Sequence, residues 1–204
     1  MIPENDPKHW QVEHADYLVK TPWLTVRQDA VRLPNGSFMP DYYLFEYPNW
    51  VNVVAVTTDG QLILVRQYRH GIAGVHYELC AGTVDPVDGT SEAGLLLAAQ
   101  RELLEETGYS GGEWQPFMTL SANTGTHTNL NYTFLATGVV WQQPQQLDDT
   151  EDIAVHLVSP EQALAIVDSG QMVQAMCVAP LLRYLCGLSS GPAGLSRSEK
   201  VEQD

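Results

Sequence analysis

Residues 101–108 read Arg101-Glu102-Leu103-Leu104-Glu105-Glu106-Thr107-Gly108. They close a segment, Glu92 to Thr107, that contains no proline and is rich in Leu, Ala, Glu and Gln, a composition that predicts a helix. Gly108 suits the left-handed conformation that often follows the last helical turn. Apolar residues recur in the segment at helical spacing and predict a face packed on a core: Leu96, Ala99, Leu103 and Leu104.

Three glutamates stand in the last turn and a half of this predicted helix. A helix C-terminus carries partial negative charge and like charges four residues apart repel, so the arrangement costs about 1–2 kcal/mol. Glu102, Glu105 and Glu106 have spacing i, i+3 and i+4, which places their carboxylates on one helical face. Such an oxygen-only set suits a hard divalent cation such as Mg²⁺. Solvated surface charges are the alternative, but their cost in stability favours a metal site.

The excess of acidic residues in the composition limits the kinds of molecule that the chain is expected to bind. The chain has 204 residues, with 25 Asp and Glu against 10 Lys and Arg, and a formal net charge of −15. Nucleic acids and anionic membrane surfaces are bound by clustered basic residues, so we expect neither as a partner. A phosphorylated small molecule remains possible for so acidic a chain if a divalent cation stands between the carboxylates and the phosphates.

The cysteines and the N-terminal residues indicate a cytoplasmic location. Cys80, Cys177 and Cys186 are an odd number at wide spacings, which predicts neither a disulfide framework nor a zinc site. Residues 1–9 are polar and carry two prolines, unlike a signal peptide. The sequence also has no stretch approaching the roughly 20 apolar residues that span a bilayer.

The first third of the chain is rich in strand signals. Residues 10–46 mix polar with apolar and aromatic residues in short bursts, and Asn35-Gly36 marks a turn between two of them. We expect an N-terminal set of antiparallel strands with a hairpin. Val51–Thr57 and Gln61–Gln67 are β-branched runs separated by three residues, which predicts a second hairpin.

Strands and helices alternate in the rest of the chain. Further strands are expected at 76–80, 114–121, 131–140 and 153–158. The first of these is expected to end in a turn at Ala81-Gly82. Ser159 and Pro160 open a helix with a capping box. Residues 173–186 predict a last helix that Pro180 kinks or restarts. This order predicts an α+β fold with helices packed on a mixed sheet.

Residues 101–108 resemble the second half of the Nudix box, the signature of the Nudix hydrolases. Arg101, Glu102, Leu103, Glu105, Glu106 and Gly108 match that pattern, with Tyr109 in the last aliphatic place. Gly82 resembles the opening glycine, although the spacing from Gly82 to Arg101 is five residues longer than in the family. Asp88 or Glu92 stands in for the first glutamate of the box.

Beyond the box, residues 10–186 resemble the ADP-ribose pyrophosphatase branch of the family. The resemblance rests on Leu64-Val65-Arg66-Gln67-Tyr68-Arg69, on Glu78-Leu79-Cys80-Ala81-Gly82 and on the Glu151-Asp152-Ile153 segment. It implies a Nudix fold, a mixed β-sheet sandwiched between helices, with an N-terminal antiparallel strand extension. We expect an N-terminal strand region at 1–48 with dimer and substrate contacts, a Nudix hydrolase domain at 49–186 and a disordered tail at 187–204.

The same resemblance implies roles for individual residues in metal binding and catalysis. It makes Glu102 and Glu106 the principal metal ligands, Glu105 a further ligand or base, and the Ala81 carbonyl and Glu151 additional oxygens. Arg101 is the arginine of the box and is expected to pair with Glu105 one helical turn on. Asp149 matches a catalytic-base glutamate in some members. The expected ion is Mg²⁺, with Mn²⁺ as a possible substitute.

Three residues are expected to bind substrate. Arg69 is expected to contact the diphosphate, since a guanidinium fork matches phosphate oxygens. Glu78 is a candidate for a substrate hydroxyl or for supporting the metal site. Trp23 resembles an aromatic residue that stacks on the nucleobase, with burial in a core or at a subunit contact as its alternative role.

The function implied by the resemblance is Mg²⁺-dependent hydrolysis of the pyrophosphate bond in a nucleoside diphosphate sugar. ADP-ribose, giving AMP and ribose 5-phosphate, is the first expected substrate. Asn123-Thr124-Gly125 replaces the Ser-Pro-Gly that is usual in that branch, which leaves other diphosphates open, such as GDP-mannose or a dinucleoside compound. A nucleotide-binding module without turnover is the remaining alternative. The resemblance also implies a homodimer.

Overall fold

The computed structural model describes residues 6–21 and 24–189. The chain divides into two compact units. The smaller unit combines the N-terminal 49 residues with Ser121–Leu130, and the larger contains Trp50–Leu120 and the chain from Asn131 onward. Ser121–Leu130 belongs to the smaller unit because strand-like pairing joins Phe45 to His127.

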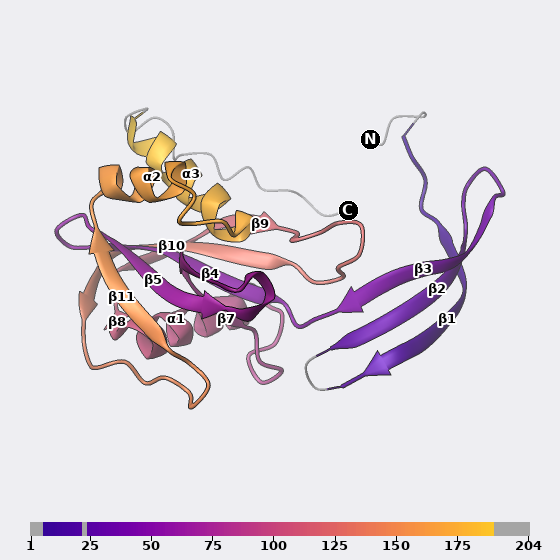
Figure 1. Cartoon of the computed structure of the whole chain (residues 1–204), viewed down its shortest axis with the longest axis horizontal. Coiled ribbons are helices and arrows are strands. Elements are labelled where there is room, and N and C mark those ends of the chain that lie inside the picture. The colour runs from indigo at the N-terminus through magenta and orange to yellow at the C-terminus, as the bar shows by residue number, and fades with distance from the viewer. Residues whose placement is uncertain (1–5, 22–23, 190–204) are drawn as a thin grey trace. The chain divides into compact units, whose positions relative to one another are not determined.

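The smaller unit is built on a three-stranded antiparallel sheet in the order β1-β2-β3 (Figure 1). Its strands are β1 (Gln11–Lys20), β2 (Thr25–Arg32) and β3 (Phe38–Glu46), and the β2–β3 connection is the hairpin predicted at Asn35-Gly36. Arg27 joins two of these strands, because its guanidinium contacts both Asp29 and Glu46. All ten residues of β1 are exposed, including Val12, Tyr17 and Leu18.

The larger unit is built on a mixed sheet with the central order β11-β5-β4-β10-β8. Its strands are β4 (Trp50–Thr57), β5 (Leu62–Arg69), β6 (Gly74–Glu78), β7 (Cys80–Thr83), β8 (Tyr109–Ser110), β9 (Glu113–Leu120), β10 (Asn131–Trp141) and β11 (Ile153–Val158). The β4–β10 pair is parallel, and the other pairs are antiparallel. A short 3₁₀ helix, His70–Ile72, connects β5 to β6.

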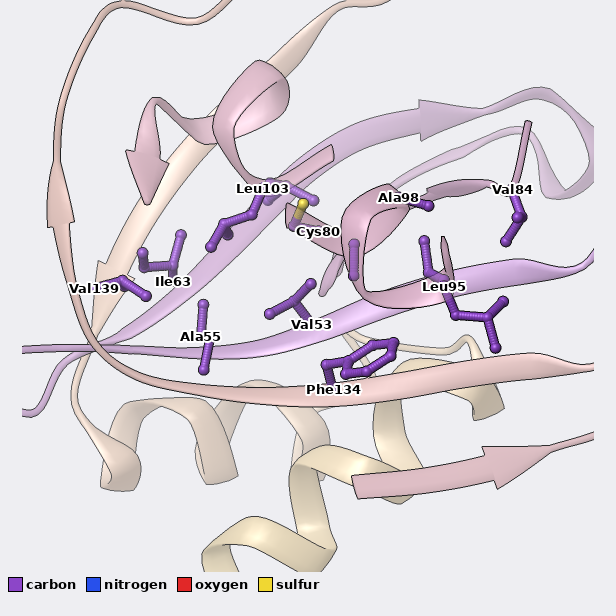
Figure 2. Close-up of a cluster of buried hydrophobic side chains, with 14 of the residues drawn as sticks. Val53, Ala55, Ile63, Cys80, Val84, Leu95, Ala98, Leu103, Phe134 and Val139 are labelled. Carbon is purple, nitrogen blue, oxygen red and sulfur yellow. The ribbon is translucent and has the colours of Figure 1, made fainter. Parts of the chain in front are cut away.

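Helices cover both faces of this sheet (Figure 1): α1 (Glu92–Thr107) on one face, and α2 (Pro160–Asp168) and α3 (Ala175–Ser189) on the other. Alternation along β4 creates the two cores. Val53 and Ala55 pack with Leu103 of α1 (Figure 2), whereas Val54 and Val56 pack in the second core with residues of α2 and α3. The sandwich expected from the sequence is confirmed.

The helix ends predicted at Gly108 and at Ser159 are confirmed, and the structure adds a cap at Ser91. The Ser91 hydroxyl caps α1 by accepting from the Gly94 N–H at 3.2 Å, and Gly108 ends the helix with φ at 76°. Ser159 forms the expected capping box of α2 with Gln162. None of the helices in the described ranges has the length and apolarity needed to cross a membrane.

The turn predicted at Ala81-Gly82 is wrong, because both residues lie in strand β7. The chain changes partner at Leu79: β6 pairs with β5, and β7 pairs with β4. Leu79 is fully buried in the second core, which fixes the point of change. Residues just before Leu79 therefore lie beside β5, and residues just after it lie beside β4.

Of the kink or restart predicted at Pro180, the restart is wrong, because helix α3 continues through the proline. Proline has no N–H to donate to the carbonyl four residues earlier, which here belongs to Met176. The Asn52 side chain in β4 supplies the missing donor, with 2.7 Å between its Nδ2 and the Met176 oxygen. A sheet residue thus replaces the lost helical hydrogen bond. The helix also includes Gly187 and extends to Ser189, so the disordered tail predicted at 187–204 is wrong for its first three residues; the rest of that range lies outside the described residues.

Candidate active site

Strand β7 and the end of helix α1 approach each other very closely. A Cβ atom on Gly82 would overlap the carboxylate of Glu102, so only glycine leaves that carboxylate in its place. The next contact is made by Ala81, whose backbone N–H donates to Glu106 Oε2 at 3.1 Å. The opening glycine and the helix-end glutamates of the sequence motif therefore meet, although they are some twenty residues apart in the chain.

Glu106 is the most enclosed of the three glutamates, with a residue exposure of 3%. Burial raises the pKa of its carboxyl to about 7, against hydrogen bonds from Cys80 and the Ala81 N–H that favour the ionised form. Nearby Glu102 and Glu151 raise it further. A buried carboxylate among other carboxylates is poised to take up either a proton or a cation.

Glu102 shares this environment. Its side chain is 12% exposed, and burial raises its pKa to about 7, while Arg101 opposes that shift and Glu105 and Glu151 add to it. Glu105 is more open, with 41% of its side chain exposed. The predicted metal face of the helix therefore contains two enclosed carboxylates and one that reaches solvent.

Arg101 gathers the acidic groups around the helix end. Its guanidinium lies 3.0 Å from Glu102 and 3.3 Å from Glu105, which confirms the predicted pair with Glu105. It also contacts Asp85 at 3.3 Å and Asp88 at 3.5 Å, in the loop between β7 and α1. Arg101 thus acts on the glutamates by orienting them.

The structure separates the two candidates for the first glutamate of the box. Asp88 contacts Arg101 and accepts from the Asp85 N–H. Glu92 is the first residue of α1 and lies ten residues before Glu102, about 15 Å along the helix. Asp88 is therefore the acid beside the helix-end cluster.

The loop before β11 is tied to the end of α1. Gln145 donates to the carbonyl of Glu106 at 2.6 Å and to that of Ile153 at 3.0 Å, which satisfies a helix-end carbonyl. Glu151 follows in this loop and accepts from the Asp148 N–H at 3.0 Å. Its charge acts on both Glu102 and Glu106. Asp149 lies exposed in the adjacent turn and makes no hydrogen bond or ion pair within the described ranges.

Arg69 and Glu78, predicted to bind substrate separately, form a bidentate ion pair. Arg69 Nε lies 2.7 Å from Glu78 Oε1, and its Nη2 lies 2.5 Å from Oε2. The Glu78 side chain is 3% exposed, whereas that of Arg69 is 43% exposed. The buried Glu78 therefore fixes the orientation of Arg69, and the guanidinium remains accessible to solvent. Trp23, the third predicted substrate residue, lies outside the described ranges.

A cavity of about 380 Å³ adjoins strand β7. It is lined by Trp50, Asn52, Arg69, Ala81, Gly82, Thr83, Asn131 and Gln174. Its three amide side chains were not predicted as site residues. The available signal was Asn52 inside the β-branched run of β4, since asparagine is uncommon in strands.

The acidic cluster fits a divalent cation by its chemistry. Glu102, Glu106 and Glu151 offer oxygens only, repel one another and are partly shielded from water, so a cation would relieve the repulsion. No three acidic, His or Cys side chains in the described part of the chain already converge on one point. Mg²⁺ commonly retains several waters in proteins, which suits a set of carboxylates that stand apart.

Comparison with known proteins shows the family to which the chain belongs. The NUDIX domain profile matches residues 47–176, the range that holds Gly82 and the glutamates of α1. The chain belongs to the Nudix family. A second profile, the nucleoside diphosphate sugar hydrolase N-terminal domain, matches residues 10–45. The Nudix chain is a hydrolase of the pyrophosphatase class, and Nudix hydrolases generally use a divalent metal.

Two curated relatives of this Nudix chain are ADP-ribose pyrophosphatases. The protein from Bacillus subtilis is 30% identical over 158 residues, which cover 77% of this chain and 82% of the relative. The protein from Mycobacterium tuberculosis is 28% identical, with coverage of 77% and 74%. A solved structure of an ADP compounds hydrolase superposes with a TM-score of 0.74, covering 89% of this chain and 94% of the other. At 20% identity, that similarity concerns the fold.

Proposed function

We propose that this Nudix chain hydrolyses the pyrophosphate bond of a nucleoside diphosphate sugar, with ADP-ribose cleaved to AMP and ribose 5-phosphate. The observation that carries the proposal is the enclosed pair Glu102 and Glu106, held against β7 beside a cavity. The names of the two curated relatives and of the N-terminal profile support the choice of substrate.

Mg²⁺ is the proposed ion, and Mn²⁺ is the proposed substitute. Glu102, Glu106 and Glu151 would hold it, with Glu105 and the Ala81 carbonyl as further oxygens. When bound, the ion supplies neutralisation of the diphosphate charge and activation of water. In the reaction, a water oxygen bonds to one phosphorus while the bridging oxygen leaves with the other.

The remaining residues bind, orient or move a proton. Arg101 holds the Glu102 and Glu105 carboxylates at 3.0 and 3.3 Å. Arg69, oriented by Glu78, offers its guanidinium to a phosphate oxygen, and Trp23 is retained as the proposed stacking partner of the base. Asp149 remains the proposed general base that takes the proton from the attacking water.

The proposal extends to assembly and location. The boundaries 1–48 and 49–186 remain our proposed domain limits. A homodimer is proposed because every residue of strand β1 is exposed, including Val12, Tyr17 and Leu18, and a second copy would bury them. A cytoplasmic location is proposed from the buried free thiols of Cys80 and Cys177, which suit a reducing compartment.

A substrate panel tests the proposed function. The full chain is incubated with Mg²⁺ or Mn²⁺ and with ADP-ribose, GDP-mannose or a diadenosine polyphosphate, and released monophosphates are separated by chromatography. We expect AMP from ADP-ribose at the highest kcat/KM. Faster cleavage of another diphosphate would reassign the substrate, and the absence of any product would leave a binding module as the better description.

A further inference from the structure

The cavity beside β7 contains an oxygen atom that the protein leaves without a partner. Asn131 is 2% exposed and lines the cavity. Its Nδ2 donates to Asn52 Oδ1 at 3.2 Å and to Thr133 Oγ1 at 3.4 Å. Its Oδ1 has no hydrogen-bond partner within the described ranges and, unlike Asn129 Oδ1, it is not fully buried. It therefore opens on the cavity.

The orientation of this amide follows from the proline in α3. The Met176 carbonyl, freed by Pro180, can only accept, so Asn52 must direct its Nδ2 toward it. Asn52 Oδ1 then faces Asn131 and accepts a hydrogen bond from its Nδ2. The carbonyl oxygen of Asn131 is left as the free end. Two consecutive hydrogen bonds thus direct an acceptor toward the cavity.

Gln174 supplies the complementary group at the cavity wall. Its Oε1 accepts from the Cys177 thiol at 3.0 Å, which leaves its Nε2 as a donor without a partner within the described ranges. Besides the Arg69 guanidinium, which the proposed function assigns to a phosphate, the cavity therefore offers one neutral acceptor on a buried side chain and one neutral donor on an exposed one. Neither atom carries charge, so both suit an uncharged group better than a phosphate.

We propose that the cavity bounded by Asn131 and Gln174 is the subsite for the uncharged end of the substrate, where Asn131 Oδ1 accepts from a neutral donor. The donor is a sugar hydroxyl or a nucleobase amine, groups that differ in source and share this chemistry. The inference rests on the proposed function. It adds that Asn131 selects the sugar or the base that is attached to the diphosphate. Buried polar groups left unpaired by a wrong ligand are an effective basis for such selection.

Substrate analogues combined with Asn131→Leu test the assignment. We compare kcat/KM for ADP-ribose, for the analogue lacking the 2-hydroxyl of its terminal ribose, and for IDP-ribose, which lacks the base amine. The parent should prefer ADP-ribose over one analogue by about tenfold. Asn131→Leu should remove that preference, and the affected analogue identifies the source of the donor.

Gln174→Leu is the second variant, because Gln174 is exposed and its replacement does not disturb the core. It should reduce the same preference. Gln61→Leu is the matched control, since Gln61 precedes β5 and does not line the cavity; it should leave the preference unchanged. Equal losses on all three substrates for both cavity variants, or a parent with no preference, would overturn the subsite. A parent that cleaves none of the three contradicts the proposed function instead, and calorimetric binding of the same ligands then tests the subsite.

Discussion

Gly82 and Glu102 are in such close contact that a Cβ atom on Gly82 would lie 2.0 Å from the carboxylate carbon of Glu102. Gly82 pairs with Val51 through its backbone in β7, so the strand itself could accept a side chain. What glycine permits is the approach of a helix-end carboxylate to the strand. Gly82, the first residue of the motif, therefore allows Glu102, a proposed metal ligand, to take its position.

Gly82→Ala should reduce activity without unfolding the protein. The added methyl group meets the far end of a flexible side chain, so the Glu102 carboxylate can turn away. We expect kcat/KM to fall by at least about tenfold, as for other misplaced catalytic groups, with a nearly unchanged Tm. Gly71→Ala is the matched control because a Cβ there meets nothing within 4 Å. Loss of Tm in parallel with activity would show that Gly82 serves folding instead.

The metal-free protein should lose stability as the pH rises from about 4.5 to 7. Burial raises the pKa of Glu102 and Glu106 from 4.5 to about 7, so the folded state binds their protons more tightly than the unfolded state does. This contribution is complete below pH 4.5 and is lost as the pH passes 7. Thermal melts in a chelator measure it.

Glu106→Gln is the comparison for this pH dependence. The variant should show a shallower fall in Tm between pH 5 and 8, because one of the two titrating groups is gone. Added Mg²⁺ should raise the Tm of the parent more at pH 8 than at pH 5, since protons compete with the ion. Identical pH profiles for parent and variant would contradict the environment described for Glu106.

Asp88→Asn and Glu92→Gln should differ in effect. Asp88 lies 3.5 Å from Arg101, whereas Glu92 opens α1 some three turns away from Glu102. Loss of one partly exposed ion pair is worth up to about 1 kcal/mol, so we expect a severalfold fall in kcat/KM for Asp88→Asn. Glu92→Gln should stay close to the parent. The reverse order would return the role of the first glutamate to Glu92.

Asn52 and Pro180 should be coupled in stability. Asn52→Leu leaves the Met176 carbonyl without a donor and should lower the free energy of unfolding by about 1–3 kcal/mol. Pro180→Ala restores an N–H for that carbonyl and should recover part of the loss in the Asn52→Leu background. Urea titrations of the two single variants and the double variant measure the coupling. Additive effects would mean that Asn52 does not compensate for the proline.

Local signals in the sequence were sufficient for the helix and for its acidic face. The composition of 92–107 and the spacing of Glu102, Glu105 and Glu106 depend only on helix geometry, and the structure agrees with both. The partner change at Leu79 could not be read in this way, because it depends on which strands lie beside the segment. A four-residue strand such as β7 has no periodicity that separates it from a turn.

The amides of the cavity escaped prediction for a related reason. Asn52 and Asn131 stand 79 residues apart in the chain, and their meeting depends on the parallel pairing of β4 with β10. Pro180 gave a local signal, but that signal indicated only a broken helix. The compensating donor comes from a strand distant in sequence, which a local pattern does not reveal.

The most direct test of the account is the rate of AMP release from ADP-ribose by the parent and by Glu106→Gln at saturating Mg²⁺. Glutamine keeps the size of Glu106 and can still accept the Ala81 N–H, but it lacks the charge needed to hold a cation. We predict steady release of AMP and ribose 5-phosphate by the parent and a loss of about 10³-fold in the variant, since metal ligation contributes several kcal/mol. Equal rates in two equally stable proteins would contradict the central role assigned to the end of helix α1.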